Sequence, residues 1–174
     1  NTKIINNTFS LFKFQFDNNY YEKNSFKILN KIRKIPFKNN FILSGMNLAF
    51  LGYFANKEVF TEKFLFHWPD GIWLKRHIDI DKIPGRDLIK NLKIPRYIKK
   101  LSVLGNLSPY SKKFLENKFK LKVENKKLPF GKIERIVKTK IKLPKNTLTL
   151  ITLPTPKQEK LAFYLAKKNP KFKI

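Results

Sequence analysis

The stretch Pro69-Asp70-Gly71 combines a carboxylate with a sharp turn. Proline presets φ at the first central position of such a turn, aspartate folds its carboxylate back on the backbone, and glycine tolerates positive φ. The same turn could present the Asp70 carboxylate on a rigid support, where it would act as a general base toward a hydroxyl group. The residue types alone leave both interpretations open.

A second group with possible chemistry is Thr155-Pro156-Lys157-Gln158. It fits a capping box, with Thr at the cap, Pro at the first helical position and Gln at the third. A helix start that follows a buried strand is also an anion site, because its free N–H groups and its dipole favour phosphate. Lys157 adds positive charge there, and Glu159 in the first turn favours the dipole. Both interpretations can hold together.

The segments that must position these residues alternate between strand-like and helix-like patterns from residue 41 onward. Apolar runs at 41–45, 63–68, 101–105 and 146–154 predict strands, and 46–55, 72–78, 85–92, 106–119 and 155–168 predict helices. The helix at 106–119 has Ser108 as a cap and Pro109 at its first position. This alternation predicts an α/β, Rossmann-like fold with a largely parallel sheet and helices on both faces. We expect residues 1–174 to form one domain, in which 8–16 could be a strand, 25–35 a helix, and 1–40 is weakly defined.

Ligands bind such sheets where strands end and helices begin. The polar residues and glycines at those places are Ser44, Asn47, Asp70, Gly105, Asn106 and the segment 155–159. No G-x-G-x-x-G and no Walker-type loop follows a strand, so the common dinucleotide and nucleoside-triphosphate sites lack their usual signature. His67 lies beside Trp68, and we expect it to be packed rather than catalytic.

The net charge of +26 favours partners that carry phosphate: nucleic acid, anionic lipid or a nucleoside diphosphate. The lysines are dispersed, and the abundance of Lys, Asn, Ile and Phe also fits drift in an AT-rich genome. The chain has no cysteine and only two histidines, which excludes disulfides, thiolate metal sites and a His-rich metal site. There is no apolar run of about 18 residues and no signal-peptide pattern, so we expect a cytoplasmic protein without metal or cofactor. The opening Asn1 and the strand-like closing residues lead us to expect a piece of a longer protein.

Five segments resemble, in order, the motifs of one enzyme family. They are GMNLAF (45–50), PDGIW (69–73), KIPGRDLI (82–89), SVLGN (102–106) and LPTPKQEKL (153–161). They look like the T-x-N segment, the P-D-G-x-G block, the R-x-x-G-x-D-L block, the "hLLGG" strand and the G-x-P-K-Q-E signature of the WecG/TagA/CpsF family, glycosyltransferase family 26. The resemblance covers about residues 40–174.

The resemblance implies an inverting, metal-independent transfer of an N-acetylmannosamine-type or related hexosyl residue from a UDP-sugar. The acceptor would be a sugar linked to undecaprenyl diphosphate at the inner face of the cytoplasmic membrane, with peripheral contact to anionic lipid. By the resemblance Asp70 is the catalytic base. The substrate-binding residues would be Ser44, Asn47, Gly71, Lys82, Gly85, Arg86, Asp87, Gly105, Lys157 and Gln158. A homo-oligomer is possible, and no nucleic acid is expected.

The chain departs from the family pattern at several positions. Gly45 stands where the family has Thr, Lys82 stands where it has Arg, and Trp73 stands where it has the second Gly of P-D-G-x-G. The Arg-rich C-terminal segment that docks family members to the membrane is absent after Ile174. Two alternatives therefore stay open. One is a diverged, non-catalytic relative, and the other is a basic nucleic-acid-binding module with a continuous Lys/Arg face and salt-sensitive binding.

Overall fold

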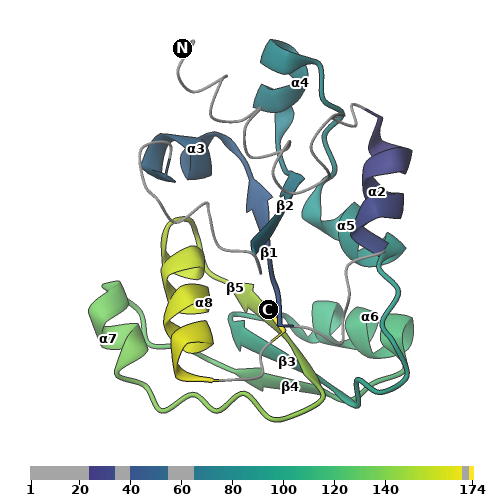
Figure 1. Ribbon diagram of the computed structural model, residues 1–174. Helices are drawn as coiled ribbons and strands as arrows, with labels where there is room; N and C mark the ends of the chain where they lie inside the picture. Colours follow the sequence, from purple (N-terminus) through teal and green to yellow (C-terminus); the bar gives the residue numbers. More distant parts are fainter. Residues whose placement is uncertain (1–23, 34–39, 55–64, 170–172) are drawn as a thin grey trace. The chain divides into compact units, whose positions relative to one another are not determined.

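The computed structural model describes residues 24–33, 40–54, 65–169 and 173–174. The chain divides into two compact units. The first unit comprises residues 1–36 and 43–92, and the second comprises 37–42 and 93–174. Figure 1 labels the helices and strands of both units. The expected strand at 8–16 lies outside the described residues, and the expectation of one domain over 1–174 stays a prediction.

The first unit is built around two short strands. Its elements are α2 (Ser25–Arg33), β1 (Ile42–Met46), α3 (Leu48–Phe54), β2 (Leu65–Pro69), α4 (Ile72–Ile78) and α5 (Gly85–Asn91). β1 and β2 form a two-stranded sheet. The Asp70 N–H, just past β2, donates to the Met46 carbonyl at the end of β1 over 3.0 Å. The two strands therefore end side by side, as parallel strands do.

A small apolar core holds the first unit together. Met46, Leu51, Leu74 and Ile80 are fully buried side chains from β1, α3, α4 and the segment that follows α4. Each such side chain contributes roughly 1.5–3 kcal/mol when it is fully buried. At the other side, the Ser25 N–H at the start of α2 donates to the carboxylate of Asp81 over 3.0 Å.

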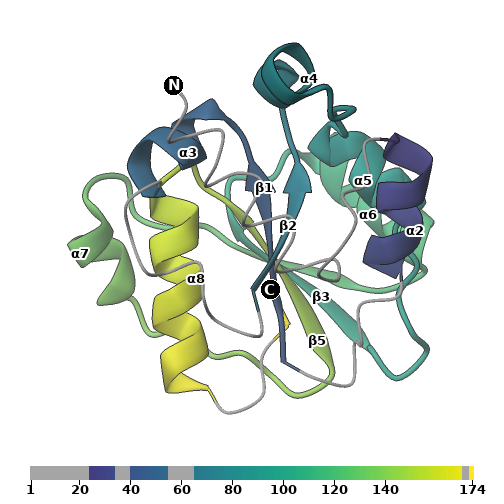
Figure 2. The ribbon, with the colours of Figure 1, turned by 45° about the horizontal axis from the view of Figure 1, so that its top comes forward.

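The second unit contains a three-stranded parallel sheet. Its elements are β3 (Lys100–Gly105), α6 (Pro109–Phe119), β4 (Val123–Lys126), α7 (Ile133–Val137), β5 (Thr147–Thr152) and α8 (Lys157–Lys168). The strand order is β4-β3-β5, with both pairs parallel. Figures 1 and 2 place α6 and α8 on opposite sides of these strands. The structure thus confirms the predicted α/β, Rossmann-like class with parallel strands and helices on both faces.

The strand order fixes where a ligand site would lie in this sheet. After β3 the chain continues into α6 on one side, and after the neighbouring strand β5 it continues into α8 on the other side (Figure 2). Adjacent parallel strands whose connections leave in opposite directions form a topological switch point, and ligands of open α/β sheets bind at the carboxyl ends of such strands. The segments after Gly105 and after Thr152 meet this condition.

The two predicted helix caps had different outcomes. Ser108 caps α6 as expected: its Oγ accepts the Ser111 N–H at 3.1 Å, and Pro109 is the first helical residue. The capping box at Thr155 is wrong, because α8 begins at Lys157 after Pro156 and has no side-chain cap. The expected bounds elsewhere hold to within a few residues, whereas β4 and α7 were not predicted.

Candidate functional site

Asp70 occupies a turn that the backbone ties down on both sides. Its N–H donates to the Met46 carbonyl, and the carbonyl of the preceding Pro69 accepts the Ile83 N–H at 2.7 Å. Gly71 follows with φ of 114°, a conformation that glycine adopts without strain, and it precedes the first residue of α4. The position of the Asp70 side chain is therefore set by backbone hydrogen bonds of the neighbouring strand and loop.

The carboxylate of Asp70 is half-buried, and burial raises its pKa above the usual value for an aspartate. Two hydrogen bonds act in the opposite direction, one from the Asn47 side chain and one from the Gly85 N–H at the start of α5. Burial is the larger effect, so the pKa stays raised. A carboxylate with a raised pKa is a stronger proton acceptor than an exposed one.

The orientation of the Asn47 amide follows from its place at the start of α3. Its Oδ1 accepts the Phe50 N–H at 3.0 Å, as the cap of a helix does. The oxygen is thus used, and the amide NH₂ is the group left to donate to Asp70. One residue therefore both caps a helix and positions the carboxylate.

Gly45 in β1 provides the space into which Asp70 and Trp68 fit. A Cβ at this position would lie 3.0 Å from Trp68 Cζ2 and 3.1 Å from the carboxylate oxygen Oδ2 of Asp70. Trp68 cannot easily retreat, because its Nε1 donates to the Ile83 carbonyl at 3.1 Å. A glycine at this position is thus matched to the packing of this chain.

His67 and Ser44 belong to the interior of the first unit. His67 is 1% exposed, and its ring packs edge-on against Phe50 with centroids 4.8 Å apart. Burial lowers the pKa of His67 to about 3, with a smaller opposite effect from a hydrogen bond to the Ser44 backbone. The imidazole is neutral at physiological pH and serves packing, as expected. Ser44 is itself buried.

The charged residues of the predicted R-x-x-G-x-D-L-like block lie toward solvent. Lys82 and Arg86 are exposed. The carboxylate of Asp87, in the first turn of α5, lies 3.8 Å from Arg86 Nε and 4.0 Å from Lys90 Nζ. No hydrogen bond or ion pair in the described residues joins Asp87 to Asp70. Of this block, Gly85 is the residue whose backbone reaches the carboxylate.

The carboxyl ends of β3 and β5 are tied together by side chains. Gly105 has φ of 120°, and a Cβ there would lie 2.5 Å from the Thr152 hydroxyl oxygen. That hydroxyl donates to the Asn106 carbonyl at 2.9 Å. On the other side of β3, the Asn125 amide donates to the Gly105 carbonyl at 3.0 Å. Gly105 and Asn106 were expected at this place, whereas Thr152 and Asn125 were not, because only the strand pairing brings them beside Gly105.

The start of α8, together with Thr155 just before it, contains a hydrogen-bonded group of three side chains. Gln158 Nε2 donates to Glu159 Oε1 at 2.7 Å and to Thr155 Oγ1 at 3.1 Å, and Thr155 Oγ1 donates to Glu159 Oε1 at 3.1 Å. Glu159 is 3% exposed. Glu159 was expected only to favour the helix dipole, whereas its side chain organises this group.

Lys157, the half-exposed first residue of α8, is adjacent in the chain to that group. Its Nζ lies 5.9 Å from the centre of the Phe130 ring, within range of a cation–π contact. Phe130 is 95% exposed and precedes Gly131 in the connection from β4 to α7. An ammonium group and an exposed aromatic ring thus lie near the start of α8.

The predicted site residues fall into two groups. The first unit holds Ser44, Asn47, Asp70, Gly71, Lys82, Gly85, Arg86 and Asp87, and the second holds Gly105, Lys157 and Gln158. In the first group the structure brings Asn47, Asp70 and Gly85 together.

No group of three or more acidic, histidine or cysteine side chains in the described residues is arranged to hold a metal ion. None of the helices in that part of the chain has both the length and the apolar composition to cross a bilayer. Comparison of the chain with protein-family models, with curated proteins and with solved structures found no match.

Proposed function

We propose that this chain is the catalytic part of an inverting glycosyltransferase. It transfers an N-acetylmannosamine-type or related hexosyl residue from a UDP-sugar to a sugar linked to a polyprenyl diphosphate. The observation that supports this most directly is the Asp70 carboxylate, which Asn47 and Gly85 hold at the end of β2 with a raised pKa. The ordered motifs of the sequence supply the reaction class.

In the proposed reaction Asp70 accepts the proton of the acceptor hydroxyl while that oxygen attacks the anomeric carbon of the donor. The bond from the anomeric carbon to the UDP oxygen breaks, and UDP leaves with the electron pair. A single displacement inverts the anomeric centre. General base catalysis of this kind contributes about 10²- to 10⁴-fold in rate.

The departing diphosphate needs positive charge and N–H donors, which this chain would supply without a metal ion. Lys157 is the residue proposed for this role, because it is the first residue of a twelve-residue helix whose start has no side-chain cap. Gln158 is proposed to bind the donor as well. We further propose a cytoplasmic location, peripheral contact with anionic lipid, and self-association of the chain.

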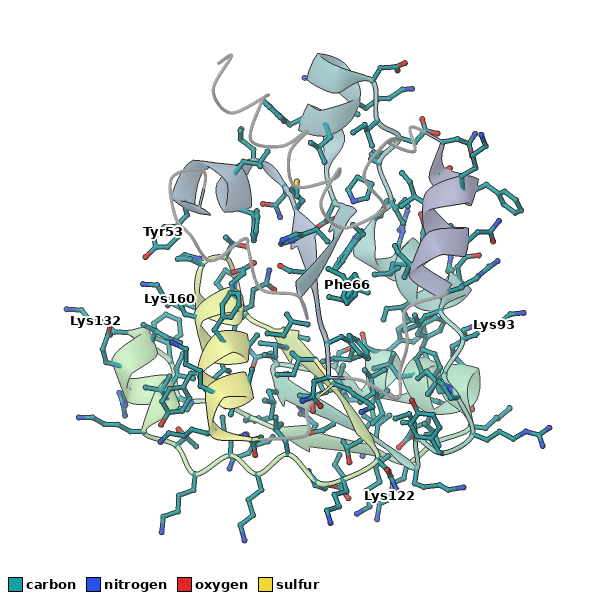
Figure 3. All side chains as sticks on the ribbon, in the orientation of Figure 1. Tyr53, Phe66, Lys93, Lys122, Lys132 and Lys160 are labelled. Carbon is teal, nitrogen blue, oxygen red and sulfur yellow. The ribbon has the colours of Figure 1, made fainter. Side chains whose placement is uncertain are left out.

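A basic nucleic-acid-binding module is the competing explanation of the charge. It would gather its cations on one face. In the second unit Lys93, Lys122 and Lys132 are exposed and point outward from three different segments (Figure 3). This dispersal favours the transferase.

The test is calorimetric titration of UDP into the chain and into three variants. We expect saturable binding that Lys157→Ala weakens several-fold and that Asp70→Asn leaves within about twofold, since Asp70 is reserved for the acceptor. Asp79→Asn is the matched control, because Asp79 is an exposed aspartate that pairs with Lys75 at 2.8 Å on the same unit.

Transfer is then measured as UDP release with a polyprenyl-diphosphate-linked N-acetylglucosamine acceptor. We expect Asp70→Asn to reduce the rate at least about 10²-fold and Asp79→Asn to leave it unchanged. The absence of UDP binding, together with tight and salt-sensitive binding to DNA or RNA, would refute the transferase and support the basic module. Normal UDP binding with no transfer by the wild-type chain would favour the diverged, non-catalytic relative.

A further inference from the structure

The amide of Gln158 has one orientation that its neighbours allow. A carboxylate only accepts hydrogen bonds, so the atom of Gln158 that lies 2.7 Å from Glu159 Oε1 is the NH₂ group. The same nitrogen also donates to Thr155 Oγ1 at 3.1 Å. Both hydrogens of the amide are therefore used by Glu159 and Thr155.

The carbonyl oxygen of Gln158 is the part of the amide that is left. No residue that the structure describes donates a hydrogen bond to it, and the side chain is half-exposed. Gln158 is the second residue of α8, the helix that follows β5 at the switch point of the sheet, where ligands of this fold class bind. The Gln158 carbonyl oxygen is thus free to accept a hydrogen bond from a ligand bound there.

The Glu159 carboxylate, which enforces this orientation of the amide, is buried at the expense of folding free energy. Glu159 is 3% exposed, and its Oε2 has no hydrogen-bond partner among the described residues. A buried carboxylate with an unsatisfied oxygen is unfavourable for folding and calls for a role that an apolar residue could not fill. Holding the Thr155 hydroxyl and the Gln158 amide is such a role, since both donate to its Oε1.

We propose that Glu159 and Thr155 are positioning residues that turn the Gln158 carbonyl oxygen toward the ligand. Gln158 then recognises a hydrogen-bond donor of the sugar, a hydroxyl or an acetamido N–H, and does not bind phosphate. The inference rests on the proposed function for the identity of the ligand. Phosphate oxygens only accept hydrogen bonds, so the diphosphate goes to Lys157 and the sugar goes to Gln158.

The first experiment compares UDP with UDP-N-acetylmannosamine by calorimetry. We expect Gln158→Ala to weaken binding of the UDP-sugar roughly two- to tenfold, the effect of one neutral hydrogen bond, and to leave UDP within twofold. Thr155→Val removes the hydroxyl and should act in the same direction, whereas Thr155→Ser keeps it and should restore wild-type affinity. An equal loss for UDP and the UDP-sugar in Gln158→Ala would overturn the proposal, because Gln158 would then contact the nucleoside diphosphate.

The second experiment needs no ligand and separates this inference from the proposed function. In the NMR spectrum of the free chain, the side-chain NH₂ of Gln158, identified by its loss in Gln158→Ala, should exchange with solvent more slowly than an exposed glutamine. Glu159→Gln keeps the volume but replaces the carboxylate by a neutral and weaker acceptor, so it should speed the exchange without lowering the thermal midpoint by more than a few degrees. Fast exchange in the wild type would refute the fixed orientation even if the UDP-sugar binds. Protected hydrogens without any UDP-sugar binding would support the orientation and refute the transferase.

Discussion

Replacement of Gly45 by alanine tests whether the packing around Asp70 is as tight as the structure indicates. The added methyl would lie 3.0 Å from Trp68 Cζ2 and 3.1 Å from both Cβ and Oδ2 of Asp70. Ordinary carbon contacts are about 3.5–4.0 Å, so both neighbours must move by several tenths of an ångström. Trp68 is held by its bond to Ile83, and Asp70 is held by Asn47 and Gly85.

The change in the free energy of unfolding of Gly45→Ala follows from two opposing effects. Overpacking of a well-ordered site costs about 1–3 kcal/mol, and removal of a strand glycine returns about 0.5–1 kcal/mol of backbone entropy. We therefore expect Gly45→Ala to lower the free energy of unfolding by up to about 2.5 kcal/mol, the largest difference of those two effects. In the same variant the carboxylate of Asp70 is displaced from its donors.

The assay is urea denaturation followed by tryptophan fluorescence, with two glycines of the same unit as controls. A Cβ at Gly52 in α3 meets nothing within 4 Å, and one at Gly85 meets only Trp68 Cζ2 at 4.0 Å. Gly52→Ala should stabilise by up to about 1 kcal/mol, and Gly85→Ala should be nearly neutral or stabilising. If Gly45→Ala proves as stable as Gly52→Ala, the close approach of Asp70 and Trp68 to β1 is wrong.

Three further outcomes are expected. Burial lowers the pKa of His67 from 6.5 to about 3, so the stability that the neutral imidazole contributes is complete above pH 6.5 and is lost as the pH falls. Urea titrations at pH 7.5 and pH 5 should show that the free energy of unfolding falls by about 2 kcal/mol less in His67→Leu than in the wild type. Asn47→Asp keeps the cap of α3 but sets a like charge beside Asp70, so NMR titration should show that the raised pKa of Asp70 rises further. An unchanged pKa of Asp70 would show that the side chain of residue 47 does not contact the carboxylate. Gly105→Ala and Gly131→Ala share the positive-φ strain of about 1–3 kcal/mol. At Gly105 the added Cβ would also lie 2.5 Å from the Thr152 hydroxyl oxygen, whereas at Gly131 it meets nothing within 4 Å, so Gly105→Ala should have the lower midpoint in thermal melts.

The sequence predicted the parts of the fold that carry strong local signals. Ser108 and Pro109 marked the start of α6 correctly, because a cap hydroxyl and a preset φ act within one turn. β4 was not predicted because Val123–Lys126 has no alternation of apolar residues. Val123 is the one buried residue of this strand. An edge strand of this kind is recognisable only from its pairing with β3.

The candidate sites show the same division between local and distant information. The turn at Pro69-Asp70-Gly71 was expected, and Asn47 was among the expected partners of the site. That the Gly85 N–H supports the carboxylate depends on how α5 packs against β2, which no spacing reveals. At α8 the expected capping box failed because the helix begins at Lys157, two residues after Thr155, and the Thr155 hydroxyl accepts the Gln158 side-chain amide instead of a backbone N–H.

The order β4-β3-β5 also bears on how the second unit is made. Leu101 of the central strand pairs with Val123 on one side and with Leu148 on the other, so the second pairing closes a loop about twice as long and costs about 0.6 kcal/mol more in chain entropy. During synthesis β4 emerges soon after β3 and can cover one of its edges, whereas the other edge stays open until residues 147–152 leave the ribosome. An open apolar strand edge is a template for pairing with other chains. We therefore expect nascent or truncated forms that end before β5 to aggregate, and forms that extend through β5 to remain dispersed.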